Sequence, residues 1–415
     1  MGHYKDLLER LGGYGDPDAC LGRAVCADCF GDAGLKAQVE VSAQYQHCDF
    51  CGVRSDETIS ADLSDIVEFI NDRLDLYYTT AENALPYESA EGGYQGEWWD
   101  TYDLLTEVLG LELPRDDGRL FQAIHDSLGT RSWCHQAPFS LSPDERLWFS
   151  WEDLCRVLKH ERRFFFRDIG ATDPTKDRET IAPGKMLHEL ERLIRHRDLI
   201  VELPAGTRMF RARHQLPGSS LRTPADLGPP PHERAVQANR MSPPGIVMLY
   251  LSDDPETALR ETAAEPATFA VAEFETLKAV SIVDLTRLPS PPSIFEINVE
   301  SDDLLVREEL GFLHSFTDDL AKPIARDDRI HVEYVPTQVV TEFLRVSART
   351  NEGSPIMGLR YPSARHPGRT SLVLFADRDS VDGDHRTPWS SIEPWIRLLN
   401  VEERDVTADD IERWP

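Results

Sequence analysis

The sequence predicts a multidomain α+β protein, and three observations support this fold class. Two cysteine pairs lie near the amino terminus, helical periodicity dominates the residues that follow, and short β-like runs between proline-rich loops fill the second half. A chain of 415 residues also exceeds what one hydrophobic core usually fills. We therefore expect a cysteine module over residues 1–56, a helical domain over 57–200, a mixed α/β domain over 201–385 and a tail over 386–415.

The cysteine module is predicted from two short motifs. "CADC" supplies Cys26 and Cys29, and "CDFC" supplies Cys48 and Cys51. Two residues within each pair let both sulfurs of a tight turn reach one ion, and four thiolates close a tetrahedral site that leaves no position for water. We therefore expect a zinc ribbon with a structural Zn²⁺. The alternative, a redox dithiol, needs only one such pair and explains the second poorly.

Charge and composition disfavour several classes of function. Asp and Glu total 73 against 44 Lys and Arg, and the formal net charge of -29 opposes nonspecific nucleic-acid binding. The ribbon is itself acidic, so we expect it to stabilise a small domain or to bind a protein partner. Apolar runs such as "GIVMLYL" are far shorter than a membrane helix, and the charged amino terminus lacks the apolar core of a secretion signal. These features predict a cytoplasmic protein without a membrane span.

Residues 57–200 are predicted to be mostly helical. Two groups of apolar residues recur with the 3.6-residue period of an amphipathic helix: Leu63, Ile66, Val67, Ile70 and Leu74, and then Leu187, Leu190 and Ile194. Within this region "RLFQAIH" separates Arg119 from His125 by five residues, a spacing that some helical ribonucleases use at a phosphodiester. A chance pair on one helix explains the spacing as well, and the acidic field opposes RNA. A ribonuclease is therefore the less favoured alternative.

Residues 201–385 contain the β-like runs "TRMFRARH", "GIVMLYLS", "VSIVDL" and "SLVLF". In "MLYLSDDPETALRET" the apolar run ends, a turn follows, and a helix is predicted to begin, with Asp254 as its cap and Pro255 as its first residue. Glu256 can pair with Arg260 four residues later. Counting 100° per residue puts Glu261 at the edge of the buried stripe, so the local pattern alone predicts a solvated carboxylate.

A family resemblance changes that interpretation. The segment "ANRMSPPGIVMLYLSDDPETALRE", with "RMFRARH" before it and "EYVPTQVVTEFLR" and "GLRYPSARHPGRTSLVLF" after it, resembles a RES domain, named for Arg, Glu and Ser. The ribbon and the helical region together resemble the HEPN-like extension often joined to such domains. This resemblance implies a fold like that of the ADP-ribosyltransferases. It also implies a toxin of a bacterial toxin–antitoxin pair that consumes NAD⁺ as its substrate.

The resemblance also implies the site residues. The loop arginine of the family falls on Arg240, the strand-end tyrosine on Tyr250, the helix glutamate on Glu261 and the serine on Ser363; an earlier strand arginine falls on Arg211, with Arg213 beside it. The loop reads "RMSPPG", where many members have an aromatic residue and an asparagine after the arginine. The resemblance therefore leaves the detailed contacts of this loop open, while the spacing of Arg240, Tyr250 and Glu261 is preserved.

Cleavage of NAD⁺ explains why these residue types belong together. Breaking the bond between ribose and nicotinamide places positive charge on the sugar, which the carboxylate of Glu261 can stabilise. Nicotinamide leaves as a neutral base, so one carboxylate is enough. Arg211 or Arg240 can hold the pyrophosphate, Tyr250 can stack on the nicotinamide ring, and Ser363 can position the substrate.

Several outcomes remain open from the sequence. The enzyme can be an NAD⁺ glycohydrolase or phosphorylase, or an ADP-ribosyltransferase that modifies a macromolecule. A different class of function is a protein that binds partners and senses NAD⁺ without turnover. An antitoxin or another regulatory protein is the partner that the resemblance implies, and a homo-oligomer is compatible with it.

Overall fold

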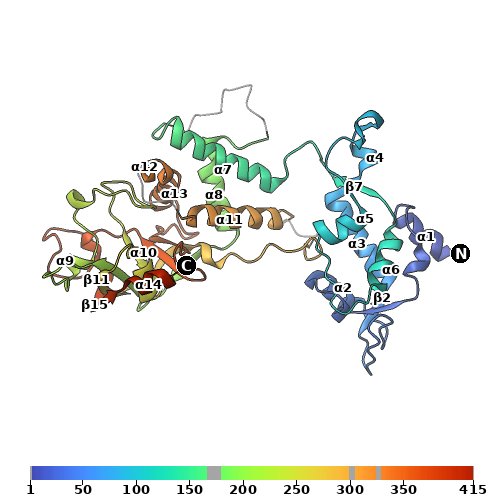
Figure 1. Cartoon of the computed structure of the whole chain (residues 1–415), viewed down its shortest axis with the longest axis horizontal. Helices are drawn as coiled ribbons and strands as arrows, with labels where there is room; N and C mark the ends of the chain where they lie inside the picture. The colour runs from blue at the N-terminus through green and yellow to red at the C-terminus, as the bar shows by residue number, and fades with distance from the viewer. Residues whose placement is uncertain (1, 166–178, 299–303, 324–328, 415) are drawn as a thin grey trace. The chain divides into compact units, whose positions relative to one another are not determined.

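The computed structural model describes residues 2–165, 179–298, 304–323 and 329–414, and it divides into two compact units (Figure 1). Unit 1 comprises Met1–Pro143 and Ser290–Glu308, and unit 2 comprises Asp144–Pro289 and Glu309–Pro415. The chain thus enters unit 2, returns to unit 1 for one short segment, and enters unit 2 again. The predicted class, multidomain with both helix and sheet, is confirmed. Residues 166–178, inside the predicted helical region, lie outside the described residues.

Unit 1 is mostly helical and has one main core. Its helices are α1 (Gly2–Arg10), α2 (Ala33–Val41), α3 (Leu63–Tyr77), α4 (Ala81–Ala84), α5 (Thr101–Asp103) and α6 (Arg119–Leu128), with short helical turns η1 (Pro17–Ala19), η2 (Ala27–Cys29), η3 (Ser89–Glu91) and η4 (Leu104–Val108). The periodic residues predicted from the sequence form the buried stripe of α3, because Leu63, Ile66 and Ile70 are fully buried in this core. The cysteines of both motifs belong to the same core.

Three small sheets complete unit 1. β1 pairs with β2, β3 and β6 flank β7, and β4 pairs with β5. Their bounds are β1 (Ala24–Cys26), β2 (Ser60–Asp62), β3 (Tyr78–Thr80), β4 (Tyr87–Glu88), β5 (Gly93–Tyr94), β6 (Trp99–Asp100) and β7 (Ser132–His135). β1 ends at Cys26 and β2 leads directly into α3, so the first cysteine motif is anchored to the main helix of the unit.

Unit 2 is built on one sheet of eight strands in the order β15-β11-β9-β10-β14-β13-β12-β8. All neighbours are antiparallel except β12 and β13, which are parallel. The bounds are β8 (Ile200–Leu203), β9 (Arg208–His214), β10 (Leu249–Ser252), β11 (Ala267–Thr276), β12 (Val280–Asp284), β13 (Gly358–Pro362), β14 (Thr370–Leu374) and β15 (Ile396–Val406). The four β-like runs predicted from the sequence correspond to β9, β10, β12 and β14.

The helices of unit 2 lie mainly against one face of this sheet (Figure 1). They are α7 (Pro143–His160), α8 (Pro183–His196), α9 (Pro224–Leu227), α10 (Pro255–Thr262), α11 (Val306–Ala321), α12 (Ile330–Glu333), α13 (Val335–Val346) and α14 (Ala408–Arg413), with turns η5 (His232–Arg234), η6 (Leu285–Arg287) and η7 (Arg378–Ser380). α7, α8, α11 and α13 share a core with β10, β12, β13 and β14, and α10 covers β9 and β11. The opposite face is covered by Leu227 of α9 and by Val381 and Trp395.

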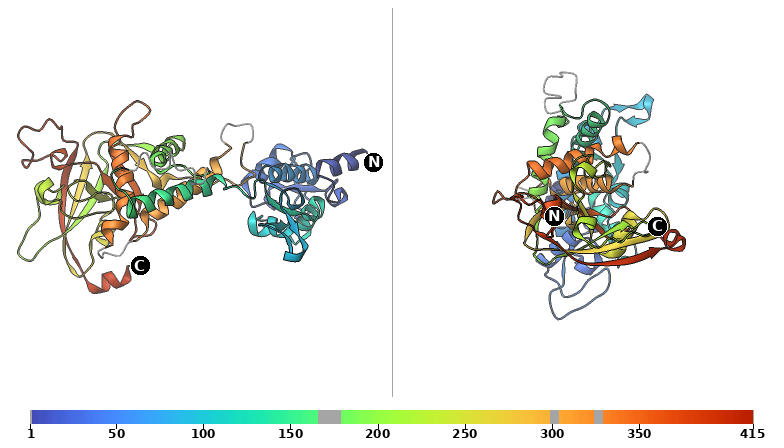
Figure 2. Two further views of the ribbon diagram at one scale, coloured as in Figure 1. Left: turned by 90° about the horizontal axis from the view of Figure 1, so that it is seen from above. Right: turned by 90° about the vertical axis from the view of Figure 1, so that its left-hand side faces the viewer.

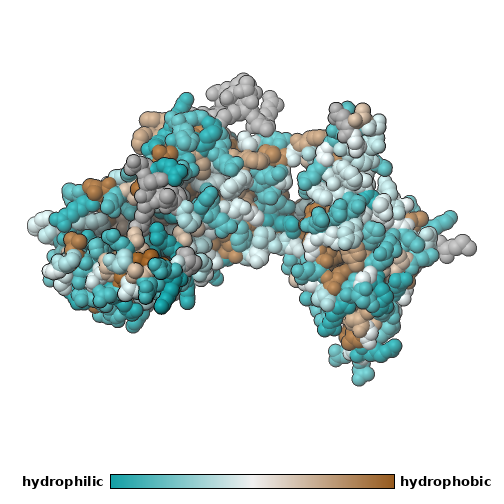
Figure 3. Space-filling model, in the orientation of Figure 1, coloured by the Kyte–Doolittle hydropathy of each residue, from teal (hydrophilic) through white to brown (hydrophobic). Residues whose placement is uncertain are grey.

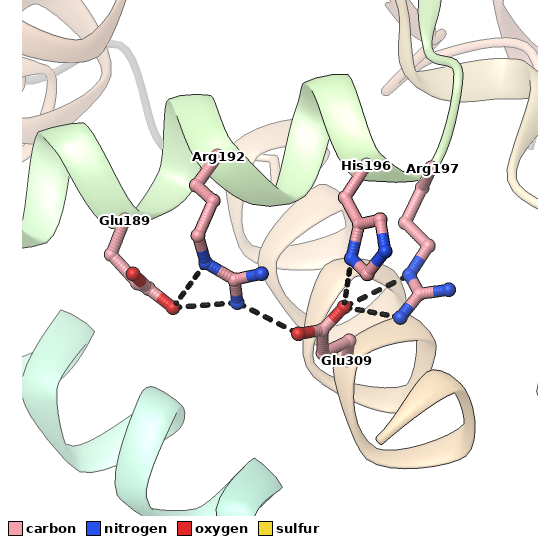
Figure 4. A network of polar contacts seen from close by, with 5 residues as sticks. All are labelled: Glu189, Arg192, His196, Arg197 and Glu309. Carbon is pink, nitrogen blue, oxygen red and sulfur yellow. Dashed lines mark hydrogen bonds and ion pairs between the residues drawn. The ribbon is translucent and has the colours of Figure 1, made fainter. Parts of the chain in front are cut away.

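α7 and α8 come from the segment predicted as part of the helical middle domain, yet their apolar stripes are buried in the core of unit 2. An amphipathic helix is stable where another surface covers its apolar stripe, and the sheet supplies that surface here. α8 is also fastened to α11 through Glu309, which is buried (Figure 4). Its carboxylate accepts hydrogen bonds from Arg192 at 2.7 Å and from Arg197 at 2.9 Å, and His196 lies 3.4 Å away.

The segment predicted as a tail is part of the domain. β15 pairs with β11 over almost its whole length and forms one edge of the sheet (Figure 2). α14 places Ile411 and Trp414 against the core under α10. Most side chains of β15 are exposed and many are charged, which is the pattern of an edge strand that resists further pairing. Such a strand lacks the apolar alternation that sequence patterns detect.

The face of the molecule drawn in Figure 3 is largely hydrophilic, in keeping with the formal net charge of -29. Within the described ranges, no helix combines the length and the apolar character that crossing a bilayer requires.

Candidate metal centre and active site

The four motif cysteines meet at one point in unit 1. The sulfur of Cys26 lies 3.7 Å from that of Cys29 and 3.5 Å from that of Cys51, and the sulfurs of Cys29 and Cys48 are 3.6 Å apart. All four sulfurs lie within 4.8 Å of one another. Four sulfurs at about 2.3 Å from a tetrahedral ion are roughly 3.8 Å apart, so the four thiols fit a single metal ion. The cluster can therefore hold a metal.

Backbone geometry explains how the second motif turns back toward the first. Gly52 follows Cys51 with a φ of 75°, a left-handed conformation that favours glycine, and its N–H donates to the Cys48 carbonyl at 3.1 Å. The side chain of Asp49 accepts a hydrogen bond from the N–H of Ala24 at 2.7 Å. This bond joins the second motif to the strand that carries the first.

Glu261 is the centre of the candidate active site in unit 2. It lies near the end of α10, a helix that Asp254 caps by accepting from the Thr257 N–H at 2.9 Å. Oε1 of Glu261 accepts hydrogen bonds from the Ser363 hydroxyl at 2.5 Å and from the Ser371 hydroxyl at 3.2 Å. Glu261 is half-buried and both serines are buried. The structure thus joins two of the predicted residues, which are a hundred positions apart in the sequence.

The loop that carries Ser363 is held in place by α10. The Ser363 hydroxyl accepts a hydrogen bond from the backbone N–H of His366 at 3.1 Å. Nδ1 of His366 lies 2.7 Å from the Thr257 hydroxyl, which in turn donates to the Asp254 carboxylate at 2.6 Å. The loop therefore contacts the start of α10 through His366 and its end through Ser363.

Tyr250 and Arg240 lie next to the helices α11 and α13. The Tyr250 hydroxyl is 2.9 Å from the Ser242 hydroxyl and accepts from the N–H of Met241, and burial raises the pKa of Tyr250. Nη1 of Arg240 donates to the Leu320 carbonyl at 2.7 Å, and the guanidinium lies 5.6 Å from the centre of the Tyr334 ring. The Thr337 hydroxyl of α13 also donates to the Arg240 carbonyl, so the "RMSPPG" loop is fixed to both helices.

Strand register shows that several of these groups share one face of the sheet. Tyr250 pairs with Val373 of β14, and Ser371, two residues before Val373, pairs with Tyr361 of β13. Positions two apart on a strand point to the same face, so Tyr250, Ser371 and Tyr361 lie on the face that α10 and α13 cover. Burial, followed by the neighbouring Tyr250 and Glu261, raises the pKa of Tyr361.

Ser371 and Tyr361 are the members of this site that the sequence prediction missed. Tyr361 stands two positions before Ser363 in "YPS", and Ser371 stands two positions before Val373 in "TSLVLF". The two-residue period of a strand is the pattern that could have placed both on the face of the candidate site.

Arg211 and Arg213 lie on the opposite face by register. On β9, Phe210 and Ala212 contact the core under α10, so the alternate residues Arg211 and Arg213 face the other side. Arg211 donates to the Gly228 carbonyl at 3.0 Å and Arg213 donates to the Asp226 carbonyl. Burial, and then Arg213, lower the pKa of Arg211 to about 10. The structure thus places these two arginines of β9 against the segment around α9, apart from the Glu261–Ser363 pair.

Arg119 and His125 are both on α6 but not on one side of it. The two residues are six positions apart, and six steps of 100° separate their side chains by about 120° around the helix axis. Nη2 of Arg119 donates to the Phe50 carbonyl at 2.8 Å, whereas Nδ1 of His125 lies 3.2 Å from Asp126. This geometry gives the ribonuclease alternative no joint site on α6.

Fold and sites together describe a helical unit with a four-cysteine centre joined to a mixed α/β domain with a serine-bound glutamate. Comparison with protein families matches residues 42–172 to the HEPN/RES N-terminal domain 1 and residues 208–395 to the RES domain. This chain is therefore a RES-domain protein with a HEPN/RES N-terminal domain, as the sequence motifs predicted. No curated protein and no solved structure was found to match it. The RES domain indicates an NAD-related, toxin-like function.

Proposed function

We propose that this protein is an NAD⁺-consuming enzyme that cleaves the bond between ribose and nicotinamide, by hydrolysis or by phosphorolysis. The observation that supports the proposal best is the position of Glu261, whose carboxylate accepts hydrogen bonds from Ser363 and Ser371 within the RES domain. These two bonds orient the carboxylate before the substrate arrives, and orientation in advance is what electrostatic stabilisation of a transition state requires.

The chemistry assigns a role to each neighbouring group. Glu261 stabilises the positive charge that develops on the ribose as nicotinamide leaves, and no proton has to reach the neutral leaving group. Tyr250, which shares the sheet face of Ser371, stacks on the nicotinamide ring. Arg240 uses one N–H group for the Leu320 carbonyl and has further N–H donors for the pyrophosphate.

Arg211 and Arg213 have a more distant role in this proposal. Their contacts with the Gly228 and Asp226 carbonyls fix the segment around α9, and a pyrophosphate would reach them only if that segment moved. Ser363 positions Glu261, and it does not act as a nucleophile.

The wider assignment follows from the family. We propose a fold related to the ADP-ribosyltransferases for the RES domain, a structural Zn²⁺ for the four cysteines, and a cytoplasmic toxin or defence effector that an antitoxin or another regulatory protein restrains. The cysteine geometry supports the zinc proposal, because closed four-thiolate sites leave no coordination position for catalysis.

Nicotinamide release from NAD⁺ by the purified full-length protein tests the proposal. We expect Glu261→Gln to lower kcat by about 100-fold or more, since a group that stabilises charge only in the transition state is removed. Glu256→Gln is the matched control, because Glu256 is on the same helix and pairs with Arg260 on the surface. Its activity should stay within about 2-fold of wild type.

The proposal fails if the wild-type protein releases no nicotinamide in the presence or absence of phosphate and of candidate acceptor proteins. Labelled NAD⁺ separates the reaction types. Free ADP-ribose indicates hydrolysis, a phosphorylated ADP-ribose indicates phosphorolysis, and a labelled macromolecule indicates ADP-ribosyl transfer. NAD⁺ binding without turnover would indicate the sensing function instead.

A further inference from the structure

Residues 109–119, which run from the end of η4 to the first residue of α6, lie against both cysteine motifs of unit 1. Next to the first motif, the N–H of Gly31 donates to the Glu112 carbonyl at 2.7 Å. A Cβ at Gly31 would come within 2.6 Å of the Glu112 Cβ, so only glycine permits this approach. Two arginines of the same segment then extend toward the cysteines.

Arg115 contacts the first motif and the last cysteine. Its Nη2 lies 2.9 Å from Oδ2 of Asp28, which stands between Cys26 and Cys29. Its guanidinium also lies near the Cys51 side chain. Arg115 therefore bridges one cysteine motif to the other.

Arg119 contacts the second motif. Its Nη2 donates to the Phe50 carbonyl at 2.8 Å and its Nη1 to the Asp49 carbonyl at 3.4 Å, and both carbonyls lie between Cys48 and Cys51. Its Nε donates to Asp117 at 2.9 Å. The guanidinium thus holds the backbone of the turn that presents the second pair of sulfurs.

We propose that Arg115 and Arg119 form the outer shell of the metal centre, and that the bound metal in turn orders residues 109–119 and the start of α6. This inference rests on the proposed metal. Four thiolates and one dication carry a net charge of about -2, which two nearby guanidiniums offset. Groups that hydrogen-bond metal ligands, or fix the backbone that carries them, orient those ligands and change metal affinity.

The start of α6 depends on this same segment. The residue before the helix, Gly118, has a φ of 98° and offers no side chain for capping. Asp116 supplies the cap instead, by accepting from the N–H groups of Leu120 at 2.8 Å and Phe121 at 2.9 Å. When the metal leaves, we expect the segment to detach from the cysteine turns and the first turn of α6 to lose its cap.

Zn²⁺ affinity of the full-length protein, measured by competition with a chromophoric chelator, tests the outer shell. We expect Arg115→Met and Arg119→Met each to raise Kd for Zn²⁺ by about 10-fold, the lower end of outer-shell effects. Arg115→Lys keeps the charge and should raise Kd less. Arg10→Met is the matched control, because Arg10 also forms a surface ion pair in unit 1, with Glu68 at 2.8 Å, and its Kd should equal that of wild type.

Hydrogen exchange of the wild-type protein with and without the chelator tests the second part of the proposal, that the metal orders residues 109–119 and the start of α6. Faster exchange across residues 109–121 together with residues 24–54 supports the coupling, whereas faster exchange confined to 24–54 overturns it. If both arginine variants bind Zn²⁺ with an affinity within 2-fold of wild type, the outer-shell role of the arginines is overturned, while the proposal of a bound Zn²⁺ still stands. A wild-type protein that binds no Zn²⁺ overturns both, while nicotinamide release remains a separate measurement.

Discussion

The local sequence pattern around Glu261 does not reveal that this residue belongs to a candidate active site. Its helix is explained by Asp254, Pro255 and the buried Ala258 and Leu259, and none of these requires a carboxylate at position 261. The family motif singled it out, and the structure adds the partners Ser363 and Ser371. Only the meeting of α10 with two strands far along the chain turns an edge glutamate into an oriented group.

The two serines allow a prediction about positioning. Hydrogen bonds to a charged group are worth about 1.5 kcal/mol or more, so we expect Ser363→Ala and Ser371→Ala each to lower kcat for nicotinamide release by about 10-fold. KM for NAD⁺ should change by less than about 3-fold, because the bonds orient Glu261. Steady-state kinetics separate the two parameters.

Ser219→Ala is the control for these serine variants, since Ser219 is exposed and bonds the Leu216 carbonyl. A change in KM with an unchanged kcat in the Ser363 and Ser371 variants would contradict the positioning role and point to a contact with the substrate instead.

At the scale of elements, strands with apolar alternation were predictable and the edge strand was not. β10, β12 and β14 each carry a run of apolar residues and β9 alternates apolar residues with arginines, whereas β15 is mostly exposed and carries many charges. β15 forms because β11 offers a partner over nearly its whole length, and a pairing partner cannot be read from the strand itself. The same limit applies to α7 and α8, whose periodicity indicates helices but not the sheet that they cover.

The contact between α8 and α11 depends on the charge of Glu309. Burial raises its pKa, but hydrogen bonds from Arg192 and Arg197 outweigh that effect, and the pKa lies below the ordinary value of 4.5. A carboxylate whose pKa is lowered by folding stabilises the fold when the pH is above the ordinary pKa. This contribution is lost as the pH falls through the folded-state pKa. The network in Figure 4 is therefore expected to weaken in acid.

We expect Glu309→Gln to lower the free energy of unfolding by about 3 kcal/mol at pH 7, because it leaves buried arginine charge without its partner. The difference from wild type should narrow as the pH falls below about 4.5, the ordinary value, and then through the lower folded-state pKa of Glu309. Urea unfolding at pH 7 and in acid measures both effects. Glu402→Gln, which breaks an exposed pair with Arg404, should change the stability by less than about 1 kcal/mol, and an equal loss in the two variants would refute the role of burial.

At the scale of the whole molecule, unit 1 is not a simple amino-terminal piece. The segment Ser290–Glu308 returns to it from unit 2, and Ile294 and Phe295 of this segment are buried in the unit 1 core. Gly34 of α2 packs so closely on Phe295 that a Cβ would come within 2.3 Å of its backbone. A fragment that ends near residue 143 would lack this part of its core.

This interleaving predicts that Phe295→Ala destabilises unit 1 by about 3 kcal/mol although Phe295 follows more than half of unit 2 in the sequence. Hydrogen exchange of α2 and α3 in urea measures the loss, and nicotinamide release reports whether unit 2 remains folded. Leu305→Ala, in the same segment but half-exposed, is the control and should change little. Equal protection of α2 and α3 in both variants would contradict the assignment of Phe295 to the unit 1 core.

The sequence by itself determined the four clustered cysteines, the RES and HEPN/RES domains, the buried stripe of α3 and the helix that carries Glu261. All of these rest on short spacings, which local geometry and family motifs preserve. Only the tertiary structure decided that Ser371 and Tyr361 join Glu261, that the tail forms β15 and α14, and that Arg115 and Arg119 contact the cysteine turns. These contacts join residues whose separation in the sequence carries no periodicity, so they exist only once the surfaces that bury them have formed.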